Sequence, residues 1–159
     1  RLKNNGNIEK LDNYANGEWW VQDFSASLAV WSIADAKAKT VLDLCAAPGG
    51  KTAQLISKGA KVTAVDISEE RMQKLKQNLE RLKLRAENII VADALEYINK
   101  NRSQKFDIIL LDAPCSATGT LRRHPEVVHI KNMQDTNTML QVQEQLLEKA
   151  SEIISPGGE

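Results

Sequence analysis

The feature that most constrains the fold is an alternation of short apolar segments with longer amphipathic ones. Four apolar runs, at residues 40–44, 61–65, 88–91 and 106–111, have the length of strands rather than of buried helices. Residues 51–58, 69–82 and 135–154 instead carry apolar side chains every three to four positions, which is the period of a helix. Nearly continuous apolar strands separated by helices predict an α/β fold, a parallel sheet with helices on both faces.

The two ends of the chain differ from this pattern. Residues 1–18 are polar and rich in Asn, and we interpret them as a linker or the remnant of a preceding domain. Apolar residues return between Trp19 and Ile33, where Ala26, Ala29 and Val30 have helical spacing and predict a helix packed on the main domain. The last residues, Ser155 to Glu159, stop abruptly, so we expect residues 19–159 to form one domain that is incomplete at its C-terminus.

Composition excludes several classes of protein. Lys and Arg total 21, as do Asp and Glu, whereas a dedicated nucleic-acid binder is usually basic. No apolar stretch is long enough to span a membrane, and the first residues do not resemble a signal peptide. Neither Cys45 nor Cys115 lies in a zinc-type pair, so we expect no metal and two reduced thiols in a cytoplasmic protein.

Polar residues follow the ends of all four predicted strands. In parallel sheets with helices on both faces, ligands bind outside the carboxyl ends of the strands, which meet at one edge. The residues that the sequence brings to this edge are Cys45 to Lys51, Asp66, Asp93 and Asp112. Four independent strand ends at one edge predict a ligand site there.

Three kinds of nucleotide-type site use this edge of a parallel sheet, and the first two are the dinucleotide site and the P-loop. A dinucleotide site wants G-x-G-x-x-G after the first strand, and that pattern is absent. Residues 45–52 miss the P-loop pattern only at its first glycine, which leaves an NTPase as an alternative. Cys45 replaces that glycine, however, and Pro48 removes an N–H from a loop that must offer N–H groups to phosphate.

An S-adenosylmethionine site fits the same residues better. It needs a tight turn of small residues beside a helix N-terminus, where the amino-acid end of the ligand lies. It also needs a carboxylate at the end of the second strand for the ribose hydroxyls, where Asp66 stands, and Asp93 is placed to meet the adenine amine. Both acids would repel a triphosphate, but they would not repel a sulfonium nucleoside.

Two long motifs carry a resemblance to a known family. Residues 43–52, Asp-Leu-Cys-Ala-Ala-Pro-Gly-Gly-Lys-Thr, resemble the cofactor motif of the RNA cytosine-C5 methyltransferases. Residues 112–120, Asp-Ala-Pro-Cys-Ser-Ala-Thr-Gly-Thr, followed by Arg122-Arg123-His124-Pro125-Glu126, resemble their fourth motif. Residues 20–27 also resemble the lead-in to the family's first strand. Within the family, the similarity is greatest to the bacterial 16S ribosomal RNA methyltransferases of the B type.

The resemblance implies the Rossmann-like fold of class I methyltransferases, here truncated before the fifth strand, and a preceding RNA-binding domain. It implies methylation of carbon 5 of a cytosine in RNA, with ribosomal RNA as the partner and S-adenosylmethionine as the cofactor. The open edge of the fourth strand would then invite self-association. The residues that it assigns to the cofactor are Cys45, Ala46, Ala47, Pro48, Gly49, Gly50, Lys51, Asp66, Asp93 and Asp112.

The residues alone and the family resemblance assign different roles to Cys115. Methylation of carbon 5 needs a thiolate that first adds to carbon 6, and Cys115, three residues after Asp112, is placed for that role. In the family, however, the Pro-Cys cysteine helps to resolve the covalent intermediate, and the nucleophile follows the fifth strand. The resemblance therefore implies that Cys115 and Asp112 assist, and that the nucleophile lies beyond residue 159, leaving this chain inactive by itself.

Several residues have plainer interpretations that remain open. Cys45 is more simply a small buried residue at a strand end, and Asp93 a turn or cap residue. Arg122 and Arg123 form a basic run that either contacts RNA phosphates or lies in solvent. The tryptophans, Trp19, Trp20 and Trp31, are expected to pack rather than to stack a base. A methyltransferase that acts on another substrate also remains an alternative, since fold alone does not define the substrate.

Overall fold

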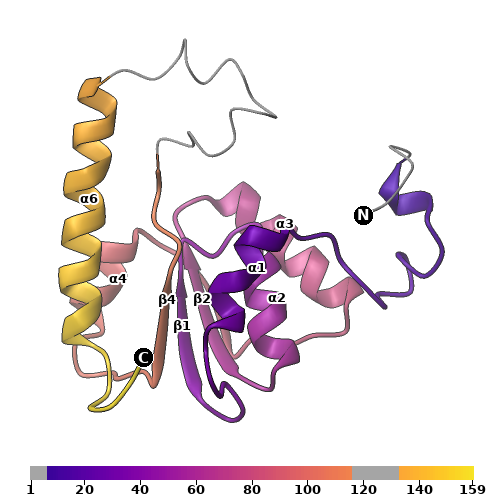
Figure 1. The fold of residues 1–159 in the computed structure, drawn as a ribbon, viewed down its shortest axis with the longest axis horizontal. Coiled ribbons are helices and arrows are strands. Elements are labelled where there is room, and N and C mark those ends of the chain that lie inside the picture. The colour runs from indigo at the N-terminus through magenta and orange to yellow at the C-terminus, as the bar shows by residue number, and fades with distance from the viewer. Residues whose placement is uncertain (1–6, 116–132) are drawn as a thin grey trace.

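The computed structural model describes residues 7–115 and 133–159, and among them four parallel strands form a sheet in the order β3-β2-β1-β4 (Figure 1). The strands are β1 (Thr40–Leu44), β2 (Lys61–Asp66), β3 (Asn88–Val91) and β4 (Ile108–Leu111). The paired residues run in register, so that Leu44 lies between Val65 of β2 and Leu111 of β4. The predicted parallel sheet is confirmed, and its strand order brings β1 to the centre.

Helices cover both faces of this sheet, as predicted, with α4 and α6 on one face and α1, α2 and α3 on the other (Figure 1). Alternate strand residues divide between the two faces, because side chains in a strand alternate. Leu42, Leu44 and Val65 pack under α4 and α6, whereas Val41, Val62 and Ala64 pack under the other three helices. The helices are α1 (Phe24–Trp31), α2 (Gly50–Ser57), α3 (Glu69–Arg81), α4 (Ala94–Lys100) and α6 (Met133–Glu152), with a short 3-10 helix at Ile8–Lys10.

The sequence signals at the ends of α2 and α3 are confirmed. Gly59 follows α2 with a φ of 87°, a left-handed conformation that favours glycine. Ser68 caps α3 by accepting a hydrogen bond from the Arg71 N–H at 3.3 Å. The predicted apolar stripe of α3 is buried along its whole length, at Met72, Leu75, Leu79 and Leu82.

Helix α1 is shorter than the helix predicted between residues 19 and 33. It begins only after Asp23, whose Oδ1 accepts the Ser25 N–H at 2.9 Å and caps the first turn. Val30 and Ile33 are buried as expected, but Ala29 is exposed. The packing predicted for Trp31 is wrong, because this residue is 66% exposed.

Helix α4 was not predicted from the sequence, which indicated only a connection between the third and fourth strands. Asp93 caps it, and Ala94, Tyr97 and Ile98 are buried at the helical spacing of three and four residues. Helix α4 packs beside α6 on the same face of the sheet, and its buried residues join the same apolar cluster as Leu146. The crossover from β3 to β4 is therefore helical, as parallel pairing favours.

Strand β4 is two residues shorter than predicted, because Phe106 forms a parallel bridge with Ile154 instead of joining β1. The residues after α6 then run beside β4. Ile109 donates its N–H to the Glu159 carbonyl, and Glu159 donates its own to the Asp107 carbonyl, both at 3.0 Å. The expectation of a fully open β4 edge is thus wrong for the first half of this strand, while self-association remains a prediction.

The segment before α1 packs on the far end of α3. The Arg81 guanidinium donates to the carbonyls of Tyr14, at 2.6 Å, and Trp19, at 3.1 Å, and it lies 3.8 Å from the centre of the Tyr14 ring. Gly17 fits against the Arg81 carbonyl so closely that a Cβ atom would lie 1.8 Å from its oxygen. Residues 7–18, part of the segment interpreted from the sequence as a linker or the remnant of a preceding domain, therefore contact the domain at α3.

Candidate functional site

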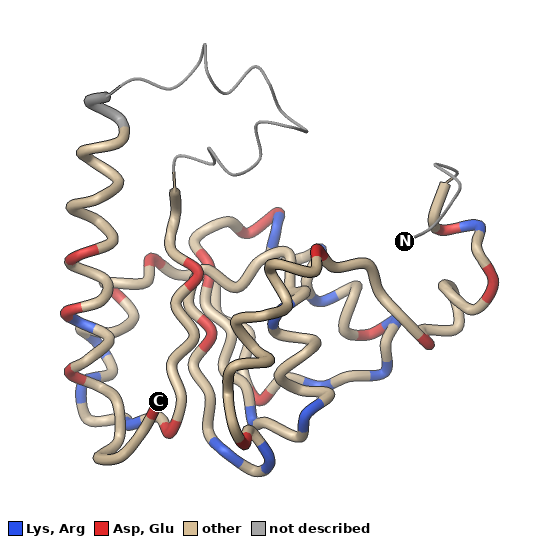
Figure 2. The backbone as a smooth tube through the Cα atoms, in the orientation of Figure 1, with Lys and Arg blue, Asp and Glu red and all other residues tan. Residues whose placement is uncertain are grey.

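The residues that follow the strands meet at one edge of the sheet, where they line two cavities that share Cys45. The first, here the Asp66 cavity, has a volume of about 210 Å³ and includes Asp66, Arg71 and Asp93. The second, here the Asp43 cavity, has a volume of about 220 Å³ and includes Asp43, Lys51 and Asp112. Acidic positions occur along this edge, whereas Lys residues gather where the strands begin (Figure 2).

The loop between β1 and α2 turns sharply enough to need two unusual backbone conformations. Cys45 has a φ of 60° and Gly49 a φ of 98°, both in the left-handed region. A Cβ atom on Gly49 would lie 2.7 Å from Cγ of Leu75, so only glycine fits where α3 approaches the loop. The loop thus brings its backbone to the cavities and directs the N-terminus of α2 toward the Asp43 cavity.

Asp66 ties this loop to the end of β2. Only 3% of Asp66 is exposed, and its Oδ2 accepts the Ala47 N–H at 3.1 Å, while its Oδ1 accepts the Ser68 N–H at 2.9 Å. Arg71 lies 3.8 Å from Oδ2 and also donates to the Ala47 carbonyl. Since a carboxylate oxygen accepts at more than one position, both oxygens still have capacity for a ligand.

The walls of the Asp66 cavity are apolar. Ile67, which is 69% exposed, lines it together with Leu95 of α4 and Val142 of α6. Asp93 lines it too, although its Oδ1 accepts the Glu96 N–H at 3.0 Å and caps α4. The cavity combines two carboxylates and Arg71 with aliphatic side chains, of which Leu95 and Val142 are partly buried, and this arrangement suits a flat, polar ring system.

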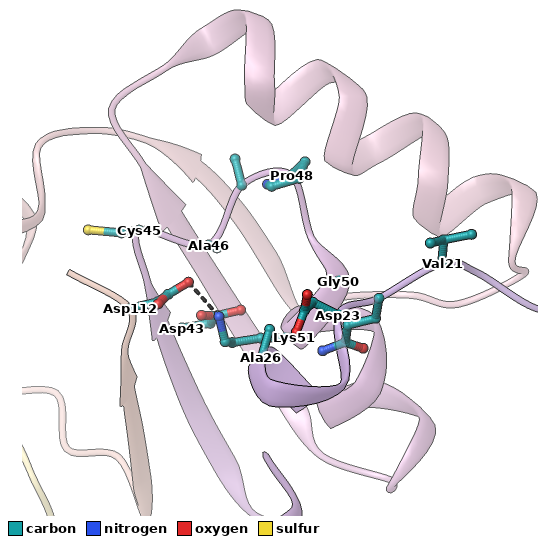
Figure 3. A pocket seen from close by; sticks show the side chains of 12 residues that line it. Val21, Asp23, Ala26, Asp43, Cys45, Ala46, Pro48, Gly50, Lys51 and Asp112 are labelled. Atoms are coloured by element: carbon teal, nitrogen blue, oxygen red, sulfur yellow. Dashed lines mark hydrogen bonds and ion pairs between the residues drawn. The ribbon is translucent and has the colours of Figure 1, made fainter. Parts of the chain in front are cut away.

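The Asp43 cavity has four charged side chains among the residues that line it, those of Asp23, Asp43, Lys51 and Asp112 (Figure 3). Lys51 Nζ lies 2.6 Å from Asp112 Oδ2, and this ion pair joins the first turn of α2 to the end of β4. Lys51 is largely covered, with 17% of its side chain exposed, against 55% for Asp112. The pair places one positive and one negative group side by side, as a zwitterionic ligand requires.

Asp43 lies beneath this ion pair and is fully buried in the middle of the sheet. Its Oδ2 accepts the Thr52 hydroxyl at 2.6 Å, whereas its Oδ1 has no partner among the described residues. Burial raises the pKa of Asp43 to about 7, against the lowering effects of Thr52 and Lys51. A buried acceptor without a partner is costly, so Asp43 favours a hydrogen-bond donor or a positive charge in the cavity.

Cys45 lies between the two cavities, and its thiol points away from the Lys51–Asp112 pair (Figure 3). Burial raises the pKa of Cys45 to about 11, and the carboxylates of Asp66, Asp112 and Asp43 act in the same direction. The thiol is therefore protonated at neutral pH and poorly suited to act as a nucleophile.

The other residues selected from the sequence have mixed positions. Cys115 is exposed, three residues after Asp112, and the neighbouring Pro114 lines the Asp66 cavity. Arg122 and Arg123 lie outside the described residues. Among the residues that the structure describes, no group of three or more His, Cys, Asp or Glu is placed to hold a metal ion.

Sequence reasoning missed some residues that line or support the cavities. Asp43 carried a signal, since it is an acid inside an otherwise apolar strand, but no role was assigned to it. Arg71 lies on the polar face of α3 and carried no signal of its own, yet it reaches back to the loop. Ile67, Leu95 and Val142 carried no signal, because their convergence depends on the positions of α4 and α6.

Comparison with known proteins connects this geometry to one family. Residues 30–159 match the family described as 16S rRNA methyltransferase RsmB/F. A ribosomal RNA small subunit methyltransferase B from Vibrio cholerae is 38% identical over 153 residues, covering 95% of this chain. The chain spans only 35% of that relative's length. Of the described helices, none is both long and apolar enough to cross a membrane.

Solved structures agree with this match. NSun6 from Pyrococcus horikoshii, determined with SFG, is 26% identical with a TM-score of 0.84, and the alignment covers 96% of this chain and 39% of that one. A methyltransferase homolog from Pyrococcus horikoshii is 31% identical with a TM-score of 0.80, covering 98% and 48%. The fold is that of the S-adenosylmethionine-dependent methyltransferases, and the match decides against the P-loop alternative. The chain belongs to the 16S rRNA methyltransferase RsmB/F family, whose methyl donor is S-adenosylmethionine.

Proposed function

We propose that the chain binds S-adenosylmethionine across Cys45 and forms part of a cytoplasmic enzyme that methylates carbon 5 of a cytosine in 16S ribosomal RNA. The observation that carries the proposal is the meeting of two chemically different cavities at Cys45. The Asp66 cavity suits a nucleoside and the Asp43 cavity suits an amino acid. S-adenosylmethionine joins these two groups through one sulfur atom.

The nucleoside end of the cofactor is assigned to the Asp66 cavity. Ribose presents two neighbouring hydroxyl donors, and the fixed Asp66 carboxylate presents two acceptors with capacity to spare. Ile67, Leu95 and Val142 offer apolar contact to a planar base, and Asp93 offers an acceptor to an exocyclic amine. A triphosphate fits these residues poorly, because it would bring several negative charges toward the buried Asp66 and the exposed Asp93.

The methionine end is assigned to the Asp43 cavity. Its α-carboxylate is matched by Lys51 and by the N-terminus of α2, and its α-ammonium by Asp112. The unpartnered Oδ1 of Asp43 offers a further acceptor to the ammonium group. The Lys51–Asp112 pair thus offers one charge of each sign before the ligand enters.

When bound, S-adenosylmethionine supplies a methyl group on positively charged sulfur. Carbon 5 of cytosine becomes nucleophilic after a thiolate adds to carbon 6, and removal of the carbon 5 proton by a base later releases that thiolate. Cys45 is assigned no covalent step, because its pKa of about 11 keeps the thiol protonated. Cys115 is assigned an assisting role in releasing the base, beside Asp112.

The family resemblance assigns the attack on carbon 6 to a cysteine that follows residue 159. Residues 19–159 are proposed to contribute the cofactor site to that reaction. The target cytosine has to leave the base stack to reach Asp112 and Cys115. Arg122 and Arg123 are proposed to contact RNA phosphates.

Calorimetric titration tests the cofactor site. S-adenosylmethionine and S-adenosylhomocysteine are expected to bind and ATP with magnesium is not. Asp66→Asn is expected to weaken S-adenosylhomocysteine at least about tenfold, because a charged acceptor is worth roughly 1.5 kcal/mol or more. The control Glu70→Gln removes an exposed acid of α3 and is expected to leave affinity unchanged.

Binding of ATP, or equal affinity in Asp66→Asn and the unaltered chain, would contradict the proposed site. Circular dichroism and melting temperature show whether Asp66→Asn remains folded, which is needed because Asp66 also holds the loop.

A further inference from the structure

Aromatic side chains gather in one groove beside the Asp43 cavity. The chain has seven aromatic residues, and four of them line this groove of about 490 Å³, here the aromatic groove: Trp19, Trp20, Phe24 and Trp31. Of the other three, Tyr97 and Phe106 are in the core, and Tyr14 packs edge-on against Trp19. The aromatic content outside the core is therefore concentrated at one place.

Two of these rings are far more exposed than packing explains. Phe24 is 77% exposed and Trp31 is 66% exposed, at the two ends of α1. Their helix is anchored by the buried Val30 and by the Lys58 ammonium, which donates to the carbonyls of Val30 and Ile33 and lies 5.4 Å from the centre of the Trp31 ring. The rings therefore contribute little to the core, and Phe24 and the part of Trp31 that Lys58 does not cover are available to a ligand.

The groove is held in shape by a chain of amide hydrogen bonds. The Trp20 indole N–H donates to the side-chain Oε1 of Gln22, and the Gln22 side-chain amide donates to Oε1 of Gln54, both at 3.0 Å. Gln54 then donates to the Ser27 carbonyl at 3.1 Å. These bonds join the lead-in segment, α1 and α2, so the aromatic walls are positioned before any ligand arrives.

Gln22 also connects the groove to the candidate site, because it lines both the aromatic groove and the Asp43 cavity. It keeps a second amide proton beyond the one given to Gln54, which leaves a donor for a ligand. Lys58 and Glu18 also line the groove, and Lys37 packs against Gly59, the residue that follows Lys58. The groove thus adjoins the Asp43 cavity at Gln22 and has one lysine among the residues that line it.

This combination is the chemistry that recognises an unpaired nucleotide. Bases unstacked from RNA bind by stacking on aromatic faces, with amide groups at their edges and lysines at the phosphates. We propose that the aromatic groove binds an unpaired nucleotide of the RNA strand, next to the nucleotide that enters the site. The inference rests on the proposed function, because it takes RNA as the substrate, and it adds a second contact for that substrate.

The test measures binding of a fluorescently labelled, single-stranded oligoribonucleotide of eight residues to the 159-residue chain by anisotropy. Trp31→Ala and Phe24→Ala are each expected to weaken binding about fivefold or more, which is the lower end of the range expected when one stacked base loses its aromatic partner. Trp31→Phe is expected to retain most of the affinity, whereas Trp31→Leu is expected to lose it. Binding of a duplex with the same sequence is expected to change little in any variant.

The matched control is Leu147→Ala on α6, since Leu147 is also 66% exposed but lies across the sheet. S-adenosylhomocysteine affinity, measured on the same samples, is expected to be unchanged, which separates failure of this inference from failure of the cofactor site. Absence of oligonucleotide binding to the unaltered chain would overturn the inference. Full affinity in Trp31→Leu would also overturn it, as would a dimer that Trp31→Ala dissociates, since both outcomes indicate an apolar protein contact.

Discussion

The Asp66 cavity and the Asp43 cavity lie on either side of Cys45, yet they are prepared for a ligand in different ways. Both oxygens of Asp66 already accept backbone N–H groups, so that carboxylate is fixed in place. Asp43 instead has one partnered and one unpartnered oxygen, and its pKa is raised to about 7. The first cavity therefore selects a ligand by the positions of its donors, and the second selects it by charge.

The largest effect that tests this difference is expected from Lys51→Met. The substitution removes the positive charge of the Asp43 cavity and leaves the Asp66 cavity intact. S-adenosylhomocysteine affinity is expected to fall about tenfold or more, because a charged hydrogen bond is worth roughly 1.5–3 kcal/mol. Adenosine affinity, measured in parallel by calorimetry, is expected to stay the same.

Lys74→Met is the control for that experiment, since Lys74 is an exposed lysine of α3 paired with Glu70. An equal loss of adenosine affinity in Lys51→Met would show that the two cavities do not select independently.

A smaller effect is expected from the titration of Asp43. Because its pKa in the folded chain is raised from 3.8 to about 7, the folded chain holds a proton that the unfolded chain has lost between these values. The stability that this proton contributes is fully present below about pH 4 and is lost as the pH rises toward 7. Melting temperature is expected to fall over this window more steeply in the unaltered chain than in Asp43→Asn.

The same group distinguishes the two ligands. An α-ammonium beside Asp43 favours the carboxylate, so S-adenosylhomocysteine is expected to release up to about one proton on binding near pH 6. Adenosine, which has no ammonium group, is expected to release none. Calorimetry in buffers of different ionisation enthalpy measures both values, and equal proton release would place the ammonium group away from Asp43.

The smallest effect is expected from Cys45→Ala. The residue contributes its backbone conformation to the turn, and its thiol is protonated and makes no hydrogen bond that positions the loop among the described contacts. Affinities for adenosine and S-adenosylhomocysteine are each expected to change less than about twofold. A tenfold loss of either would assign the thiol a direct contact, and Cys45→Ser would then test whether a polar atom restores it.

The sequence was sufficient for the parts of the fold that depend on local pattern. The apolar runs predicted the strands, and the acids after them predicted an edge where Cys45, Asp66 and Asp112 lie together. Helix α4 was missed because it has only seven residues, and its signal, the Asp93 cap with Tyr97 and Ile98, is short.

The remaining features depend on contacts between distant segments. Gln22 reaches Gln54, 32 residues away, and Arg71 reaches the Ala47 carbonyl, 24 residues away. No local pattern specifies either contact, since polar residues on a helix face are usually solvated. Asp43 could be predicted only in part. Its unusual place in an apolar strand is visible in the sequence, but its unpartnered oxygen is visible only in the structure.

The fit of Gly17 against Arg81 also constrains the lengths of chain that this domain tolerates. Val21, which lines the Asp43 cavity, follows Gly17 by only four residues, and the carbonyl of Trp19 between them is held by the same guanidinium. An insertion or deletion between Gly17 and Val21 would therefore displace a wall of the cavity. An insertion or deletion before Asn13 would leave Gly17 and the Trp19 carbonyl in place. Variation in chain length among relatives is therefore expected before Asn13.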